Sequence, residues 1–283
     1  MAENDKITAP EGPRVRYSDE ELEEFRAIIN DMLSKARKEY DTLRRVITHG
    51  GSNDIEDTAP SFKTVEDDGA FQLTKEEAGQ LALQHIDEET DYLKALYRDT
   101  HVKLLRPRMA SGHLQGRMLK MFVRMIRPKQ ILEIGTYSGY SALCLAEGLE
   151  DGGMLHTFEI NDEQEDFTRP WLEQSPYADR IKFYIGDALE LLPQMDITFD
   201  LAFVDGDKRK YIEYYEQVLK MLSPGGYIIA DNTLWDGHVL EEPHHTDMQT
   251  IGIKKFYDLV ATDKRVEKVI LPLRDGLTII RKK

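Results

Sequence analysis

The chain has 283 residues, of which 41% are hydrophobic and 31% charged, and its formal net charge is −15. This length allows one large domain or two smaller ones, and an acidic balance shared by both parts of the chain excludes a generic polyanion binder. The single cysteine, Cys144, excludes an internal disulfide and a cysteine-rich zinc site, and its apolar helical surroundings predict a core residue. No signal peptide or bilayer-long apolar run is visible, so we expect a cytoplasmic protein.

Residues 1–85 have the pattern of a helical hairpin. Ser18-Asp-Glu-Glu21 is a capping box, and apolar residues then recur from Leu22 to Val46, mostly with the 3-4 alternation of a coiled coil. Gly50-Gly51 ends this first helix, and a second capping box at Thr74-Lys-Glu-Glu77 begins a return helix. We therefore expect a separate N-terminal helical hairpin.

From residue 86 onward the pattern becomes that of an α/β domain. Two helical segments, at about 88–103 and 112–127, precede an alternation of short apolar strands and amphipathic helices. The expected strands are 130–134, 154–159, 181–185, 199–204 and 226–231, followed by a hairpin of 266–273 and 277–281. Strand–helix alternation implies a parallel sheet covered on both faces. Residues 86–283 should thus form a doubly wound, seven-stranded, Rossmann-like α/β sheet with an antiparallel final hairpin.

A glycine-rich turn follows the first expected strand. It reads Glu133-Ile-Gly135-Thr-Tyr137-Ser-Gly139 and leads into a helix, so glycines there allow a sharp turn and close approach to a ligand. The spacing differs from the dinucleotide pattern Gly-x-Gly-x-x-Gly. A carboxylate two residues before the first glycine suits the ammonium group of S-adenosylmethionine (SAM), whereas it would repel a pyrophosphate. The alternative is a tight turn that needs glycine only for packing.

Acidic residues also end the next two expected strands. Glu159 can accept hydrogen bonds from both hydroxyls of a ribose, and Asp187, in Gly186-Asp187-Ala188, can accept one from an adenine amino group. Each alone could be a helix cap. Their occurrence at successive strand ends favours a nucleoside cofactor.

The fourth and fifth expected strands end in candidate metal ligands: Asp205, Asp231 and Asn232. Carboxylate and amide oxygens are hard donors that favour magnesium, manganese or calcium over zinc. Adjacent parallel strands lie about 5 Å apart, so both carboxylates can reach one ion. The alternatives are a strand-end cap at Asp205 and a turn at Asp231-Asn232.

Lys208 is the candidate base. It lies three residues past Asp205, and a dication nearby would lower the pKa of its ammonium group enough for it to accept a proton. The alternative is a surface lysine, because Arg209 and Lys210 follow directly.

These motifs, in the order Glu133–Ser141, Val204–Lys208 and Asp231–Gly237, resemble the cation-dependent O-methyltransferases, a family that includes catechol and caffeoyl-coenzyme A methyltransferases. The resemblance covers about residues 88–283 and implies SAM and a divalent cation as cofactors. It implies Asp205, Asp231 and Asn232 as metal ligands, and Asp205 and Lys208 as catalytic residues. The implied cofactor-binding residues are Met109, Ser111, Glu133, Gly135, Tyr137, Gly139, Ser141, Glu159, Ile160, Asp187, Ala188 and Asp205. Where catechol enzymes have a glutamate near the C-terminus, this chain has Thr278, a departure from simple catechol specificity.

A second resemblance concerns residues 17–84, which are similar to the N-terminal coiled-coil arm of the DksA/TraR transcription factors. The arm tip of that family carries Asp-x-x-Asp-x-Ala and enters the secondary channel of RNA polymerase, and this chain reads Asp54-Ile-Glu-Asp57-Thr-Ala59. The zinc finger of that family is missing here. The resemblance implies a polymerase contact through Asp54 and Asp57; the alternative is a solvated acidic loop on a hairpin that makes only oligomer contacts.

We therefore expect transfer of a methyl group from SAM to a hydroxyl oxygen of a small phenolic or catechol-like acceptor. Two alternatives stay open: methylation of a hydroxylated tRNA base, for which nine basic residues between Arg98 and Lys129 could provide a surface, and a polymerase-binding regulator. The apolar stripe of the first helix, which includes Phe25, Ile29 and Met32, is longer than the return helix can cover. With the dimers typical of the resembled family, this favours a homodimer.

Overall fold

The computed structural model describes Arg26, residues 81–240 and residues 242–283. The chain divides into two units, Met1–Ala70 and Phe71–Lys283, and every described residue except Arg26 belongs to the second unit. The expected N-terminal hairpin lies almost entirely outside the described residues. Asp54 and Asp57 lie outside them too, as does the apolar stripe with Phe25, Ile29 and Met32. The domain boundary after residue 85 therefore stays a prediction.

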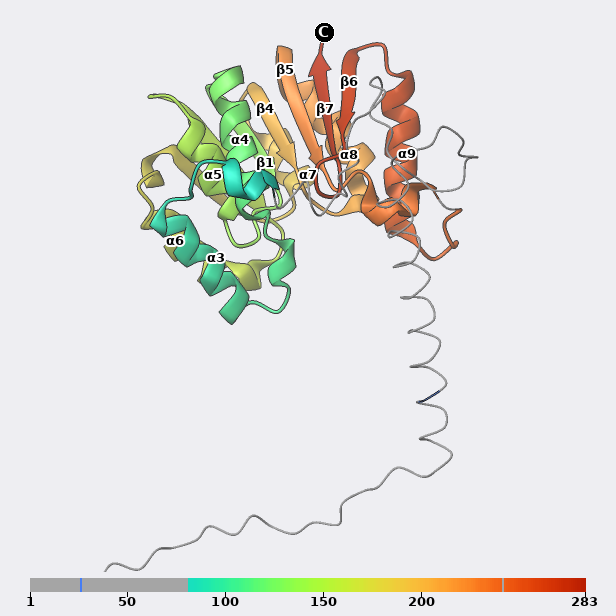
Figure 1. Cartoon of the computed structure of the whole chain (residues 1–283). Coiled ribbons are helices and arrows are strands. Elements are labelled where there is room, and N and C mark those ends of the chain that lie inside the picture. Colours follow the sequence, from blue (N-terminus) through green and yellow to red (C-terminus); the bar gives the residue numbers. More distant parts are fainter. Residues whose placement is uncertain (1–25, 27–80, 241) are drawn as a thin grey trace, which may run out of the picture. The chain divides into compact units, whose positions relative to one another are not determined.

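Seven strands form one sheet in the order β3-β2-β1-β4-β5-β7-β6. The strands are β1 Gln130–Ile134, β2 Met154–Glu159, β3 Ile181–Ile185, β4 Phe199–Val204, β5 Leu222–Asp231, β6 Val266–Leu271 and β7 Leu277–Lys282. The first five are parallel, whereas β7 pairs antiparallel with both β5 and β6. The expected seven-stranded sheet with an antiparallel final hairpin is confirmed (Figure 1).

Helices cover both faces of the sheet (Figure 1). They are α3 Asp91–Lys103, α4 Gly112–Ile126, α5 Tyr140–Gly148, α6 Glu165–Glu173, α7 Ala188–Leu191, α8 Tyr211–Met221 and α9 Met248–Thr262. Short 3₁₀ turns join them: η1 Pro107–Met109, η2 Asp162–Gln164, η3 Ala178–Arg180, η4 Leu192–Gln194, η5 Lys208–Lys210 and η6 Trp235–Leu240. Among the described helices, none is both long and apolar enough to cross a membrane.

The core has two layers because successive strand residues point to opposite faces. Leu132 and Ile134 of β1 pack in the layer that includes α7, α8 and α9, whereas Ile131 packs in the layer that includes α3 to α6. Glu133 alternates to the same face as Ile131. The strand order reverses between β1 and β4, which in such sheets opens a crevice at the carboxyl edge. That edge carries the acidic strand ends.

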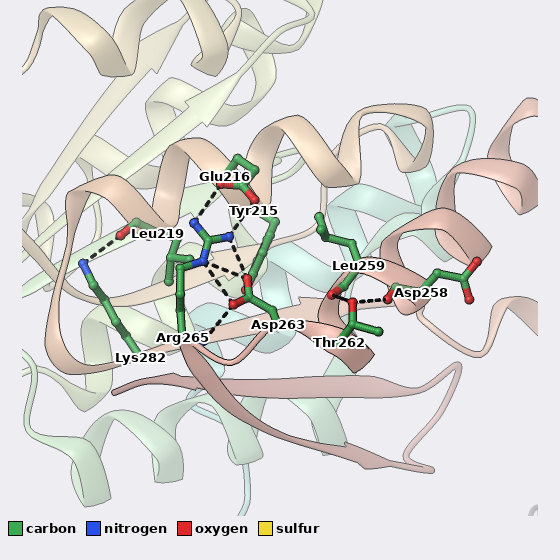
Figure 2. A network of polar contacts seen from close by, with 9 residues as sticks. All are labelled: Tyr215, Glu216, Leu219, Asp258, Leu259, Thr262, Asp263, Arg265 and Lys282. Atoms are coloured by element: carbon green, nitrogen blue, oxygen red, sulfur yellow. Dashed lines mark hydrogen bonds and ion pairs between the residues drawn. The ribbon is translucent and has the colours of Figure 1, made fainter.

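At the other end of the sheet, opposite the carboxyl edge, a polar network joins α8, α9 and the final hairpin (Figure 2). Asp263, directly after α9, accepts hydrogen bonds from Tyr215 Oη at 2.8 Å and from the Arg265 guanidinium, which also pairs with Glu216 at 2.7 Å. Lys282 Nζ donates to two carbonyl oxygens at the end of α8 and the start of β5. This network fixes the hairpin to the helices at the end of the sheet remote from the acidic edge.

Candidate active site

The turn after β1 is pressed against the end of β4. Gly135 has a φ of +101°, and a Cβ placed there would lie 2.4 Å from the carbonyl oxygen of Asp205. Its N–H donates to the Phe158 carbonyl at 2.9 Å, which fixes the turn to β2 as well. Only glycine fits this conformation and this contact. Gly135 is therefore needed for packing, and this need is compatible with a role in a cofactor loop.

Glu133 is fully buried at the root of this turn. Its Oε2 accepts a hydrogen bond from Thr157 Oγ1 at 2.5 Å, whereas its Oε1, like the nearby Ser138 Oγ, has no hydrogen-bond partner among the described residues. Burial raises the pKa of Glu133 to about 8, although a hydrogen bond from Ser141 acts in the opposite direction. A buried carboxylate with a free oxygen fits a cationic ligand such as the cofactor's ammonium group.

Glu159 is held firmly where β2 ends. Its two carboxylate oxygens accept backbone N–H groups, Oε2 from Tyr137 at 2.7 Å and Oε1 from Asn161 at 2.9 Å. Tyr137 has a φ of +48°, so the glycine turn bends back onto this carboxylate. The next residue, Ile160, is 62% exposed.

Asp187 both caps a helix and forms an ion pair. Its Oδ1 accepts from Leu189 N at 2.9 Å, which caps α7, and its Oδ2 lies 2.8 Å from Lys210 Nζ. The hydrogen bond from Lys210 lowers the pKa of Asp187. Both oxygens thus have protein partners, so the contact to an adenine amino group stays a prediction. Ala188 beside it is buried.

Asp205 and Asp231 end adjacent parallel strands in register, since Val204 pairs with Ala230. Asp231 is buried, and its Oδ1 accepts from Asn232 N at 2.7 Å. Burial and then the charge of Asp205 raise the pKa of Asp231. A positive charge between the two carboxylates would therefore stabilise their ionised forms. The donor set of two carboxylates and one amide suits a hard divalent cation. In the described part of the chain, no group of three or more His, Cys, Asp or Glu residues forms a metal cluster.

Lys208 lies inside the site and not on the surface, so the surface alternative is wrong. It is 6% exposed, and its Nζ donates to Asp205 Oδ1 at 2.7 Å and Tyr211 Oη at 2.6 Å. Burial lowers its pKa, but the acidic groups around it, with Asp205 first, raise it more, so the net direction is upward. This direction holds for the protein without a cation, so the lowering expected beside a dication stays a prediction. Arg209, by contrast, is exposed, as expected.

Three polar residues of the site were not singled out from the sequence: Gln115, Tyr211 and Arg274. Gln115 is buried on α4 in the same stripe as Leu119 and Val123, four residues apart. A glutamine on the apolar stripe of a helix is the sequence signal from which Gln115 could have been found. The sequence holds no such signal for Arg274, because its role depends on the turn between β6 and β7.

Two further predicted residues lie on the segment before α4. Ser111 is buried, whereas Met109 is 53% exposed. The Ser111 carbonyl accepts a hydrogen bond from Arg274 Nη1, which ties this segment to the turn between β6 and β7. The structure therefore brings the segment to the carboxyl edge of the sheet, and its contact with the cofactor stays a prediction.

A doubly wound sheet with acidic residues ending β2, β4 and β5, and a buried carboxylate below the glycine turn, defines the class of SAM-dependent methyltransferases. Residues 83–283 match the sequence profile of the family described as O-methyltransferase, so the chain belongs to this family. The protein is a SAM-dependent O-methyltransferase.

Similar proteins agree in sequence and in structure. A caffeoyl-CoA O-methyltransferase from Stellaria longipes is 28% identical over 78% of this chain and 95% of its own length. An O-methyltransferase from Bacillus cereus solved in complex with SAH is 31% identical, with a TM-score of 0.68 over 73% of this chain and 97% of that chain. The O-methyltransferase TomG from Streptomyces achromogenes, involved in tomaymycin synthesis and solved with SAM, is 27% identical, with a TM-score of 0.67 over 73% of this chain and 96% of that chain.

Proposed function

We propose that this enzyme transfers the methyl group of SAM to a hydroxyl oxygen of a small phenolic acceptor with a neighbouring oxygen, and that it requires a divalent cation. The observation that carries the proposal is the pair Asp205 and Asp231 at the ends of adjacent strands, with the buried amine of Lys208 beside them. The caffeoyl-CoA enzymes among its relatives support the phenolic class.

We assign the cofactor's parts to groups along the carboxyl edge. Glu133 Oε1, which is buried and has no hydrogen-bond partner among the described residues, is assigned to the ammonium group, and Glu159 to the ribose hydroxyls. We assign the remaining contacts to Met109, Ser111, Gly135, Tyr137, Gly139, Ser141, Ile160, Asp187 and Ala188. Fixed contacts of this kind hold sulfur, methyl carbon and acceptor oxygen in line, and such positioning supplies much of the acceleration of a transfer reaction.

Asp205, Asp231 and Asn232 would hold the cation. When bound, a magnesium, manganese or calcium ion supplies charge that favours ionisation of an acceptor hydroxyl. Lys208 Nζ is the group that we assign to receive the hydroxyl proton. It must first reach the reaction as the neutral amine, which requires the negative charge of its acidic neighbours to be offset.

Thr278 narrows the acceptor class. Its side chain is 1% exposed and its hydroxyl donates to Thr233 Oγ1 at 2.9 Å, so it is engaged within the protein. A catechol enzyme's glutamate at this position would be a charged partner for a second hydroxyl. We therefore favour phenolic acceptors that the enzyme recognises through a group other than the second hydroxyl, such as the acyl group of caffeoyl-CoA. Free catechol has no such group.

The test is methyl transfer from labelled SAM by the full chain to catechol, caffeate, caffeoyl-CoA and total tRNA. We expect product on the phenolic acceptors, with more on caffeoyl-CoA than on catechol, loss of activity with EDTA and recovery with magnesium. Asp205→Ala should abolish transfer, whereas the matched control Asp151→Ala, on a fully exposed surface carboxylate, should not. Transfer that resists chelation, or full activity in Asp205→Ala, would count against the proposal.

The tRNA alternative is tested in the same assay. Its support was the run of nine basic residues between Arg98 and Lys129, but two of these, Arg117 and Lys120, pair with Glu147 at 2.6 and 2.7 Å. The basic surface is thus smaller than the sequence suggested. Methylation of tRNA but of no phenol would favour the alternative.

A further inference from the structure

Gln115 connects a candidate metal ligand to a distant turn. Its side chain is 1% exposed, and its Nε2 donates to Asp231 Oδ2 at 2.5 Å. Its Oε1 accepts from Arg274 Nη1 at 2.5 Å, and the same nitrogen of Arg274 donates to the Ser111 carbonyl. These contacts join the start of α4, the end of β5 and the turn between β6 and β7.

The polarity of this chain of hydrogen bonds is fixed by Arg274. A guanidinium can only donate, so the oxygen of the Gln115 amide faces Arg274 and the amide nitrogen faces Asp231. The neutral amide of Gln115 orients the carboxylate of Asp231 and leaves its negative charge available to a cation. A lysine or arginine in place of Gln115 would neutralise that charge. The second oxygen of Asp231 is held by Asn232 N, so both oxygens are oriented.

The turn that carries Arg274 is itself bound to the residues that follow Asp231. Thr233 N donates to the Gly276 carbonyl at 3.1 Å, and Leu234 N donates to the Asp275 carbonyl at 2.8 Å. A Cβ on Gly276 would lie 2.4 Å from Leu234 Cγ. Arg274 has a φ of +50°, a conformation that this tight packing holds in place. The guanidinium is therefore presented from a fixed base.

We propose that Gln115 and Arg274 are positioning residues that orient Asp231 for the divalent ion and couple it to the cofactor segment at Ser111. The proposal rests on the metal dependence of the proposed function. Because Arg274 holds Ser111 and Gln115 with one nitrogen, ordering of the segment by SAM should tighten ion binding, and by linkage the ion should tighten SAM binding equally.

The test measures Mn²⁺ affinity of the full chain by electron paramagnetic resonance, without an acceptor, for the wild type, Gln115→Leu, Arg274→Met and the double variant. Removing groups that hydrogen-bond a ligating carboxylate weakens metal binding roughly 10–100-fold, and we expect this for Gln115→Leu, with a smaller loss for Arg274→Met. In the Gln115→Leu background, Arg274→Met should add nothing, because the effect passes through the amide. The control is Arg281→Met, which removes an exposed arginine of the same hairpin.

Calorimetry with SAM, with and without Mn²⁺, gives the second readout. The wild type should show mutual tightening of the two ligands, and Arg274→Met should lose it. Gln115 is buried, so folding of each variant is checked by thermal unfolding; should Gln115→Leu not fold, exposed Arg274 carries the test alone. A wild type that does not bind Mn²⁺ contradicts the metal-dependent function itself. A wild type that binds it, with variants of unchanged affinity or with losses that multiply in the double variant, contradicts only the positioning role.

Discussion

Glu133 shows how a single buried carboxylate links cofactor binding to stability. Burial raises its pKa from the usual 4.5 to about 8 in the absence of a ligand. Between these pH values the folded protein holds a proton that the unfolded chain has released. The free energy of unfolding should therefore fall as the pH rises from about 4.5 to about 8.

Glu133→Gln should remove this pH dependence. We expect the variant to match the wild type near pH 5 and to exceed it at pH 8 by roughly 1–4 kcal/mol in urea unfolding of the cofactor-free protein. The affinity for SAM should fall roughly 10–100-fold, because the ammonium loses its charged partner. The control is Glu173→Gln on an exposed carboxylate. A wild-type stability that is flat over this range would contradict the assignment.

Gly135 offers a test of the close approach between the glycine turn and β4. Gly135→Ala places a Cβ 2.4 Å from the Asp205 carbonyl, so we expect a loss of about 3 kcal/mol or more and strongly weakened SAM binding. Gly152→Ala is the matched control, since Gly152 also has a positive φ but nothing lies within 4 Å of its Cβ. It should lose only about 1 kcal/mol. Equal losses in urea unfolding would show that the φ angle alone matters.

At the scale of elements, the network at the α9–β6 junction should stabilise the final hairpin (Figure 2). The Arg265 guanidinium holds the pKa of Asp263 well below its usual value of 3.8. The stabilisation is therefore complete above about pH 4 and is lost as the pH falls below it. We expect Asp263→Asn to lower the free energy of unfolding by about 1–3 kcal/mol at pH 7, and the gap to the wild type to shrink in acid. Asp258→Asn, at an exposed position on α9, is the control.

The periodicity of the sequence predicted the positions of the strands more accurately than it predicted their lengths. The expected bounds of β1 to β4 agree with the structure, since each is a short apolar run between turn residues. β5 was expected to begin at residue 226 but begins at Leu222, because Pro224 and two glycines obscured the start of its sheet pairing. β6 ends at Leu271, before Pro272, which cannot donate to a ladder.

The candidate site was predictable where a motif follows a strand and was not where tertiary contacts decide. Glu133, Glu159, Asp205 and Asp231 could be placed at one edge because parallel strands share their carboxyl ends. The upward shift in the pKa of Lys208 could not be foreseen from the sequence, since Tyr211 and Asp231 meet it only in the fold. Arg274 was invisible for the same reason.

At the scale of the whole molecule, the homodimer stays a prediction from the apolar stripe of Phe25, Ile29 and Met32, which lies outside the described residues. We expect the full chain to sediment as a dimer and a chain that starts at residue 86 to do so less, because an uncovered stripe would be removed. Two monomeric species would contradict the dimer.

The polymerase contact through Asp54 and Asp57 stays an alternative to a plain acidic loop. Under this alternative, RNA polymerase should retain the full chain in a pull-down, and Asp54→Ala with Asp57→Ala should release it without loss of methyl transfer. Glu56→Ala, between the two, is the control. Retention that is indifferent to these aspartates would favour the plain acidic loop.

The position of β7 between β5 and β6 has a consequence for the order of folding. In the described sheet, β6 pairs with β7 alone, and β7 also pairs with β5. Until β7 docks, β6 has no strand to join and β5 presents an open edge, the feature that promotes association between chains. The turn with Arg274 also closes only when β7 docks. Docking of β7 therefore protects the edge of β5 and completes the site in one step.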